Sequence, residues 1–168
     1  MNRITIRRSK MIKSLIATAV VISSSFLGSI ANASVCIVGQ VKEVGTWVNQ
    51  DSNTRGVTKV IFGEECRDAS TVKCNGDICS ITSAVKLVYT ARVWGKCHPT
   101  DCYWGKVDGK YTSAKWLRFY YDPGFAKKTV WGQIKSGDNN KLRLVVDTYF
   151  TDSSGRKDYQ TDDWMIRR

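Results

Sequence analysis

The segment from Trp94 to Gly105 reads almost the same from both ends. It begins and ends in a Trp-Gly pair, and it contains Cys97 and Cys102 with four residues between them. Those four residues, His98-Pro99-Thr100-Asp101, favour a turn, because proline fixes φ and the Asp and Thr side chains can bond nearby backbone groups. The segment therefore predicts a β-hairpin whose tip is closed by a disulfide and whose two arms each carry a tryptophan.

All cysteines of the chain lie after residue 33, and their number is even. They are Cys36, Cys66, Cys74, Cys79, Cys97 and Cys102. In an oxidising compartment this predicts up to three disulfides, although spacing alone does not fix the connectivity of six cysteines. Turn residues between close neighbours favour Cys74–Cys79 and Cys97–Cys102, which leaves Cys36 and Cys66 to close a longer loop.

Residues 1–33 are predicted to be a cleaved signal peptide. Basic residues precede two apolar runs, Leu15–Ile22 and Phe26–Ile30, and Ala31-Asn32-Ala33 has the small-x-small pattern of a signal-peptidase site. The apolar stretch is too short and too interrupted by serine to span a bilayer. We therefore expect a secreted or periplasmic protein that begins at Ser34 and has no transmembrane segment, with Met11 as an alternative start.

The predicted mature chain is moderately basic. The whole sequence has 26 Lys and Arg against 15 Asp and Glu, and five of the basic residues lie before residue 34. Residues 34–168 therefore keep 21 basic against 15 acidic residues, a net charge of +6. The charges are scattered, as on an ordinary soluble domain, and nucleic acid is not an expected partner.

Short strand-like runs recur along the chain, and no window shows a helical period. Strands are predicted at Val57–Phe62, Ala69–Lys73, Cys79–Thr82, Val85–Trp94, Tyr103–Val107, Lys115–Tyr121, Lys128–Ile134, Leu142–Phe150 and Tyr159–Ile166. Turns are predicted at Asn75-Gly76-Asp77, Asp108-Gly109-Lys110, Asp122-Pro123-Gly124, Ser136–Asn140 and Asp152–Gly155.

Two of the predicted strands alternate clearly between apolar and polar residues. In Val85–Trp94 and in Leu142–Phe150, every second residue is apolar over most of the run, which is typical of an antiparallel sheet with one buried face. Short turns between consecutive strands predict an up-and-down β-barrel of about eight strands, because closure removes the sheet edges. We predict one such domain over residues 34–168, with a β-sandwich as the alternative.

Four motifs resemble a recurrent, largely uncharacterised secreted β module. They are Gly45–Asn49 (GTWVN), Asn53–Gly56 (NTRG), the cysteine hairpin segment Trp94–Gly105, and Phe150–Tyr159 (FTDSSGRKDY). The module implies export but no particular activity, and this chain differs from it at Tyr103, where the module has an acidic residue. The Gly45-Thr46-Trp47 motif, together with the basic C-terminus, is also weakly similar to calycin barrels (lipocalins and avidin-like proteins). In those barrels an N-terminal Gly-x-Trp packs beneath a C-terminal basic residue.

The hairpin segment is the predicted binding surface. Its candidate ligand-binding residues are His98, Asp101, Trp94, Tyr103, Trp104 and Arg92. Aromatic side chains can stack on a sugar ring or fill a partner's pocket. We therefore predict a non-catalytic binding module for a carbohydrate, a protein or a small ligand, without a cofactor.

Two other classes of function remain as alternatives. A small secreted hydrolase could use His98 with Asp101, or the aspartates late in the chain, as acid–base groups. A secreted inhibitor or effector could insert the rigid hairpin into a partner's cleft. Metal binding by Cys97, His98 and Cys102 is not expected, because export favours the disulfide and a zinc site needs a fourth ligand.

Overall fold

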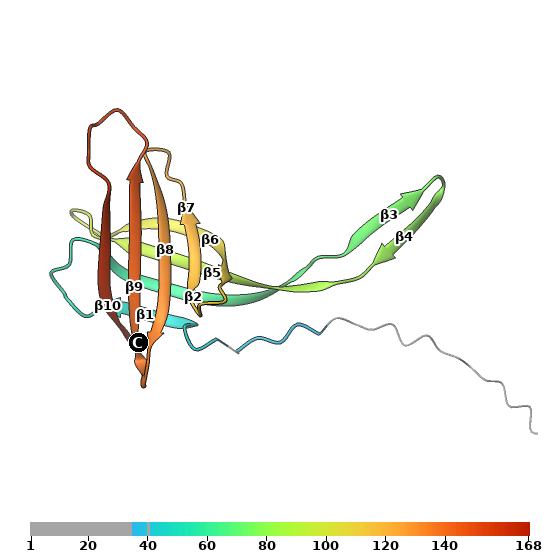
Figure 1. Ribbon diagram of the computed structural model, residues 1–168, viewed down its shortest axis with the longest axis horizontal. Helices are drawn as coiled ribbons and strands as arrows, with labels where there is room; N and C mark the ends of the chain where they lie inside the picture. Colours follow the sequence, from blue (N-terminus) through green and yellow to red (C-terminus); the bar gives the residue numbers. More distant parts are fainter. Residues whose placement is uncertain (1–34, 40) are drawn as a thin grey trace, which may run out of the picture. The chain divides into compact units, whose positions relative to one another are not determined.

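The computed structural model describes residues 35–39 and 41–168, which form ten β-strands and no helix (Figure 1). The strands are β1 (Gly45–Asn49), β2 (Val57–Asp68), β3 (Thr71–Asn75), β4 (Ile78–Thr82), β5 (Val85–Gly95), β6 (Cys102–Tyr111), β7 (Leu117–Tyr121), β8 (Ala126–Lys135), β9 (Asp138–Phe150) and β10 (Tyr159–Arg167). The predicted signal peptide, its cleavage site and the alternative start at Met11 lie outside the described residues. Within the described ranges, no helix is long and apolar enough to cross a membrane.

Eight of the strands close into an antiparallel barrel, which confirms the predicted fold. Their order is β1-β10-β9-β8-β7-β6-β5-β2, and β1 pairs with both β10 and β2. Apart from that closure, each strand lies beside its neighbour in the chain, with the β3–β4 hairpin inserted between β2 and β5. The connectivity is therefore up-and-down, as short turns between successive strands require.

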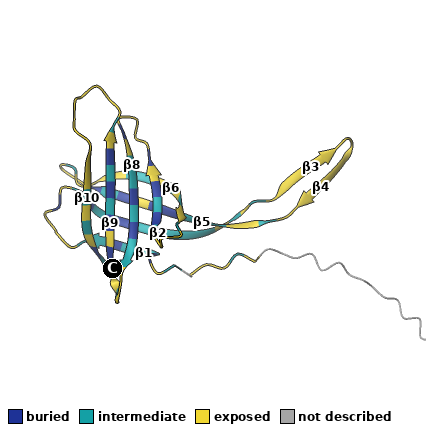
Figure 2. Ribbon diagram, in the orientation of Figure 1, coloured by how far each residue is buried: buried dark blue, intermediate teal, exposed yellow. Residues whose placement is uncertain are grey.

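Apolar side chains fill the middle of the barrel. Alternate residues are buried in the middle of β9, from Leu142 to Thr148, and Val130 and Gly132 are buried on β8 (Figure 2). The rings of Phe62 and Phe119 stack there with centroids 5.1 Å apart. Gly132 leaves room for this stack, because a Cβ atom at that position would collide with the Phe62 ring. The packed middle separates the two ends of the barrel from each other.

One end of the barrel is closed by Trp47, which is completely buried. Its indole Nε1–H donates to the carbonyl of Glu43 at 2.8 Å. The Arg167 guanidinium lies over the ring, with Cζ 4.1 Å from the centroid, and donates to the carbonyls of Val44 and Lys42. The side chain of Arg167 thereby joins β10 to the segment that precedes β1.

Most of the predicted turns are confirmed, but the turn predicted at Asp108-Gly109-Lys110 is wrong. These residues continue β6, and the chain turns only at residues 112–116. Gly109 pairs with Phe119 on β7, and a Cβ atom there would collide with the Phe119 ring. The glycine therefore gives space to an aromatic neighbour instead of making a turn.

The inserted β3–β4 hairpin, here called the arm, pairs only within itself. The β2–β5 ladder reaches Asp68 and Val85, and the arm's own ladder begins at Thr71 and Thr82. Every residue of β3 and β4 is exposed (Figure 2).

All three disulfides favoured by the cysteine spacing are present. Cys74–Cys79 crosses the arm, Cys97–Cys102 crosses the β5–β6 loop, and Cys36–Cys66 ties the N-terminal segment to β2.

Candidate ligand-binding site

The end of the barrel opposite Trp47 carries a cavity of about 410 Å³. In an up-and-down barrel alternate loops meet at the same end, and the loops 50–56, 96–101, 122–125 and 151–158 all belong to this one. The cavity is lined by residues from the first three of these loops and from the strands around them: Arg55, Gly56, Val57, Gly95, Lys96, Cys97, Cys102, Tyr103, Trp104, Tyr121, Asp122, Pro123, Phe125, Lys128, Val146, Tyr159 and Thr161. We call it the loop-end cavity.

Trp104 and Tyr121 meet edge to face inside this cavity, with ring centroids 5.8 Å apart. Trp104 reaches the interior because the β5–β6 register shifts between Arg92 and Trp94, next to Gly105 with φ +99°. Such bulges redirect side chains. Tyr121 is only 4% exposed and donates to the carbonyl of Ala91 at 3.0 Å, and burial raises the pKa of its phenol.

Cations outnumber acids in the cavity lining. Arg55, Lys96 and Lys128 face a single carboxylate, Asp122, which accepts the backbone N–H of Gly124 at 3.0 Å. Lys128 Nζ lies 4.5 Å from the centroid of the Trp104 ring. The cavity therefore combines apolar ring surfaces with an excess of positive charge, and it can accept an anionic group on an apolar body.

The cysteine hairpin forms part of the cavity rim. Cys97 and Cys102 line the cavity, whereas Asp101 turns toward the neighbouring strand β2. Its carboxylate accepts the Thr58 hydroxyl at 2.6 Å and lies 3.8 Å from Lys96 Nζ. Asp101 thus fixes the loop that carries the disulfide.

Apart from Asp101 and His98, the predicted site residues divide into three groups. Tyr103 and Trp104 line the loop-end cavity. Trp94 lies behind Tyr103, with ring centroids 4.8 Å apart, and Lys59 Nζ is 3.8 Å from the Trp94 ring centroid. Arg92 is exposed on β5 opposite Lys106 and does not line the cavity.

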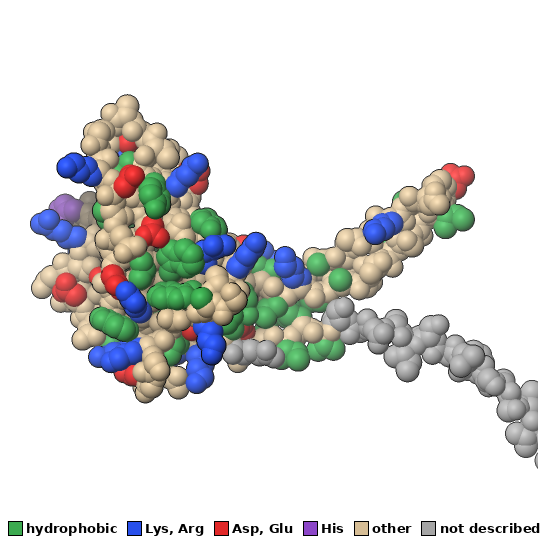
Figure 3. Space-filling model, viewed as in Figure 1, with side chains coloured by type: hydrophobic (Ala, Val, Ile, Leu, Met, Phe, Trp, Pro, Cys, Tyr) green, Lys and Arg blue, Asp and Glu red, His purple; other side chains and the backbone are tan. Residues whose placement is uncertain are grey.

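His98, the only histidine of the sequence, is exposed on the loop (Figure 3). In the described part of the chain its imidazole makes no hydrogen bond, so it is not oriented by Asp101. Both neighbouring cysteines are in a disulfide. No group of three or more His, Cys, Asp or Glu side chains within residues 35–39 and 41–168 could hold a metal ion.

The cavity residues that come from the other loops are not among those that the hairpin motif predicts. Arg55, Tyr121, Phe125, Lys128 and Tyr159 are far from the hairpin in the chain. Their shared position follows from the up-and-down connectivity, which brings the first, third, fifth and seventh barrel loops together. The turns predicted at Asp122–Gly124 and Asp152–Gly155 were the sequence features that located two of the loops at this end of the barrel.

No protein-family model, curated protein or solved structure matches this chain.

Proposed function

We propose that this protein is a non-catalytic binding module whose loop-end cavity takes a small ligand with an acidic group and an apolar, ring-containing body. The observation that carries the proposal is the cavity itself, in which aromatic side chains are combined with three cations and one acid. Its volume of about 410 Å³ lies in the usual range for small-molecule sites, roughly 300–1,000 Å³.

The ligand's acidic group would bind the cations that have no ion-pair partner. Lys96 lies near Asp101, whereas Arg55 and Lys128 make no ion pair with any described residue. The apolar body would lie against Trp104, Tyr121 and the neighbouring rings. The Cys97–Cys102 disulfide supports this by holding one wall of the cavity in place before the ligand arrives, which lowers the entropic cost of binding.

Export is part of the proposal. Three disulfides are compatible with an extracellular location, and the proposed signal peptide would direct the chain there. N-terminal sequencing of the protein recovered from outside the cytoplasm should begin at Ser34. An intact Met1 or Met11 would refute this part of the proposal.

The hydrolase alternative has less support, because most of its candidate acids already serve in turns and ladders. Asp147 accepts the Trp131 indole N–H at 2.9 Å, and Asp158 accepts the backbone N–H of Phe150 at 2.8 Å. Asp152 and Asp162 form ion pairs with arginines. If the protein is a binding module, the H98A variant should change its ligand affinity by less than about twofold. If His98 were a catalytic acid–base, the same substitution would lower the reaction rate by about 10²–10⁴-fold.

Two fluorescent probes with similar ring systems can test the proposed cavity. 8-Anilinonaphthalene-1-sulfonate carries a sulfonate, and N-phenyl-1-naphthylamine does not. We expect the native protein to bind the sulfonate roughly tenfold more tightly, a difference of about 1.4 kcal/mol. In the R55Q/K128Q variant this preference should disappear, while the affinity for the neutral probe changes by less than about twofold.

Two controls make the result specific. The K157Q/K127Q variant removes two positive charges outside the cavity lining and should keep the preference. Circular dichroism in the near ultraviolet verifies tertiary packing, because partly unfolded proteins bind the sulfonate nonspecifically. Equal affinities for the two probes in the native protein, or equal effects of the two double substitutions, would show that the cavity is not an anion site.

A further inference from the structure

The outer face of the barrel places two positive charges directly opposite each other. Lys110 on β6 pairs in register with Arg118 on β7, and Arg118 pairs with Trp131 on β8. Arg118 lies between Leu117 and Phe119, which are both completely buried, so its side chain faces outward with that of its partner Lys110. Like charges directly opposite each other in an antiparallel pair are destabilising. A bound anion would remove that cost.

The guanidinium of Arg118 is held in place by aromatic rings. Its Cζ atom lies 5.2 Å from the centroid of Tyr120 and 5.3 Å from that of Trp131. Its Nε atom is buried and has no hydrogen-bond partner among the described residues. A guanidinium fixed in this way presents its donors in one orientation, which suits a planar or tetrahedral anion.

The acidic groups nearest to this row are engaged elsewhere. Asp108, two residues before Lys110 on β6, also lines the groove described below, but its carboxylate is bonded to Arg67 at 2.5 Å. Asp147 accepts the indole N–H of Trp131, and Asp162 is bonded to Arg143 at 2.6 Å. Within the described ranges, neither Lys110 nor Arg118 forms an ion pair.

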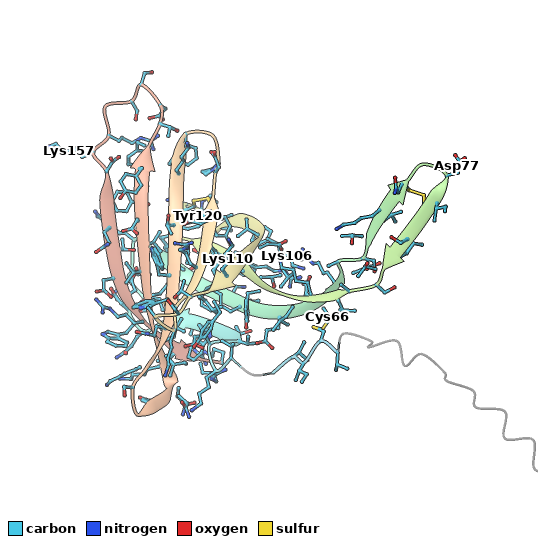
Figure 4. All side chains as sticks on the ribbon, turned by 45° about the vertical axis from the view of Figure 1, so that its right-hand side comes forward. Cys66, Asp77, Lys106, Lys110, Tyr120 and Lys157 are labelled. Atoms are coloured by element: carbon cyan, nitrogen blue, oxygen red, sulfur yellow. A yellow bond between two sulfur atoms is a disulfide. The ribbon has the colours of Figure 1, made fainter. Side chains whose placement is uncertain are left out.

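The row borders a shallow groove of about 480 Å³ on β5, β6 and β7. Its lining adds a third cation, Lys86, and three tyrosines, Tyr89, Tyr111 and Tyr120. Figure 4 shows Lys110 and Tyr120 on neighbouring strands, with Lys106 further along the same face. Tyr120 is 58% exposed, so its ring is available to a ligand that lies along the surface.

We infer that this groove is a second binding site, separate from the loop-end cavity, and that it takes an acidic glycan. The sulfate or carboxylate groups would bind Lys110 and Arg118, and a sugar ring would lie on Tyr120. An open groove suits an extended glycan, which can lie along the strands, better than it suits a compact ligand. The three disulfides also favour an oxidising environment, where acidic polysaccharides are common polyanions.

Isothermal titration of the full chain with four probes tests this inference. The probes are a short dextran sulfate, an oligogalacturonate, unsubstituted dextran and a single-stranded oligonucleotide. We expect at least one of the two acidic glycans to bind at least tenfold more tightly than the other two probes. Preference between sulfate and carboxylate then identifies the anionic group.

Substitutions locate the site. R118Q and K110Q should each weaken glycan binding about tenfold, and R118K should weaken it less than R118Q does, because it keeps the charge but loses the planar donors. K157Q removes one positive charge from the loop between β9 and β10 (Figure 4) and should change the affinity by less than about twofold. Binding of 8-anilinonaphthalene-1-sulfonate to the loop-end cavity should be unaffected by R118Q.

Three outcomes would overturn the inference. Equal losses in R118Q and K157Q would mean a response to net charge alone. Equal binding of sulfated and unsubstituted dextran would exclude an anion site. Tightest binding of the oligonucleotide would assign the groove to nucleic acid instead of a glycan. These three comparisons concern the groove alone. Their outcome does not depend on whether the two fluorescent probes show an anion site in the loop-end cavity.

Discussion

Gly95 determines how Trp104 lies in the wall of the loop-end cavity. A Cβ atom at position 95 would lie 2.8 Å from Cζ2 and Nε1 of the Trp104 ring, closer than real contacts allow. Because Gly95 is buried and Trp104 packs against the core, neither side can move freely. The absence of a side chain at one residue therefore sets the position of a large ring on the next strand.

We expect the G95A substitution to lower the free energy of unfolding by about 1–3 kcal/mol, the usual cost of overpacking. It should also weaken binding of 8-anilinonaphthalene-1-sulfonate, since the displaced Trp104 ring would enter the cavity. Urea unfolding and a fluorescence titration measure the two effects.

A second substitution tests whether the collision with Trp104 is the cause. Phenylalanine lacks the ring atoms that a methyl group at position 95 would contact, so the G95A/W104F variant should be more stable than the sum of the two single effects predicts. Additive effects would show that G95A acts in some other way.

At the scale of the elements, ion pairs connect β2 to β6 across the strand between them. Glu65 on β2 bonds Lys106 on β6 and also Arg67 at 2.8 Å, and Arg67 bonds Asp108 on β6. The hydrogen bonds from Lys106 and then from Arg67 lower the pKa of Glu65 to about 2 from an ordinary 4.5. The carboxylate therefore stays charged in the folded state at a pH where it is protonated in the unfolded chain.

A lowered carboxyl pKa stabilises the fold above the ordinary value, and this contribution is lost as the pH falls toward the folded-state value. We expect the Tm of the native protein to fall between about pH 4.5 and pH 2, and E65Q to show a smaller fall over that window. D77N is a suitable control, because Asp77 at the tip of the arm forms no ion pair with any described residue. Identical pH profiles for native protein and E65Q would contradict the expectation.

We expect the stability of the arm to be independent of the barrel. An isolated two-stranded hairpin is marginally stable in water, and β3 and β4 pair with no other strand. We expect the C74S/C79S variant to be cleaved faster by trypsin within the arm, at Lys73, while the Tm of the barrel changes by less than about 2 °C. A fall of more than about 5 °C would show that the arm supports the barrel.

The same elements show which parts of the fold could be predicted from the sequence. Alternation located the buried faces of β5 and β9, and turn residues located the hairpins, because both signals are local. Gly109 was misread as a turn because its role depends on Phe119, ten residues further along the chain. The continuation of β2 beyond Phe62 was missed for a similar reason, since its partner residues 85–90 lie across the inserted arm.

At the scale of the whole molecule, the candidate site depends on closure. Tyr103 and Trp104 were predicted from the hairpin alone, whereas Arg55 and Lys128 join them only because the barrel brings four loops to one end. The hairpin motif alone does not reveal these two positive charges, because they come from other parts of the chain. The site inferred from the closed barrel is therefore a cationic cavity, whereas the site predicted from the sequence was a surface centred on the hairpin.

Closure also depends on one residue near the C-terminus. Arg167 covers Trp47 and donates to Val44 at 2.9 Å and to Lys42 at 2.6 Å. Hydrogen bonds to a charged group contribute about 1.5–3 kcal/mol each, and less where they are exposed. We expect R167A to lower the free energy of unfolding by about 2–3 kcal/mol, which urea unfolding monitored by tryptophan fluorescence would measure.

The adjacent residue provides a matched control for this prediction. The backbone N–H of Arg168 donates to the carbonyl of Thr46 at 3.0 Å, and R168A keeps that bond while it removes the same charge. R167K should recover only part of the lost stability, because an ammonium lacks the planar fork that covers Trp47 and reaches both carbonyls. If R167A and R168A destabilise the barrel equally, the charge of the terminus matters and the contact with Trp47 does not. If only R167A does so, the contacts of the Arg167 side chain stabilise the closure beyond the backbone pairing of β1 with β10, at the end of the barrel opposite the loop-end cavity.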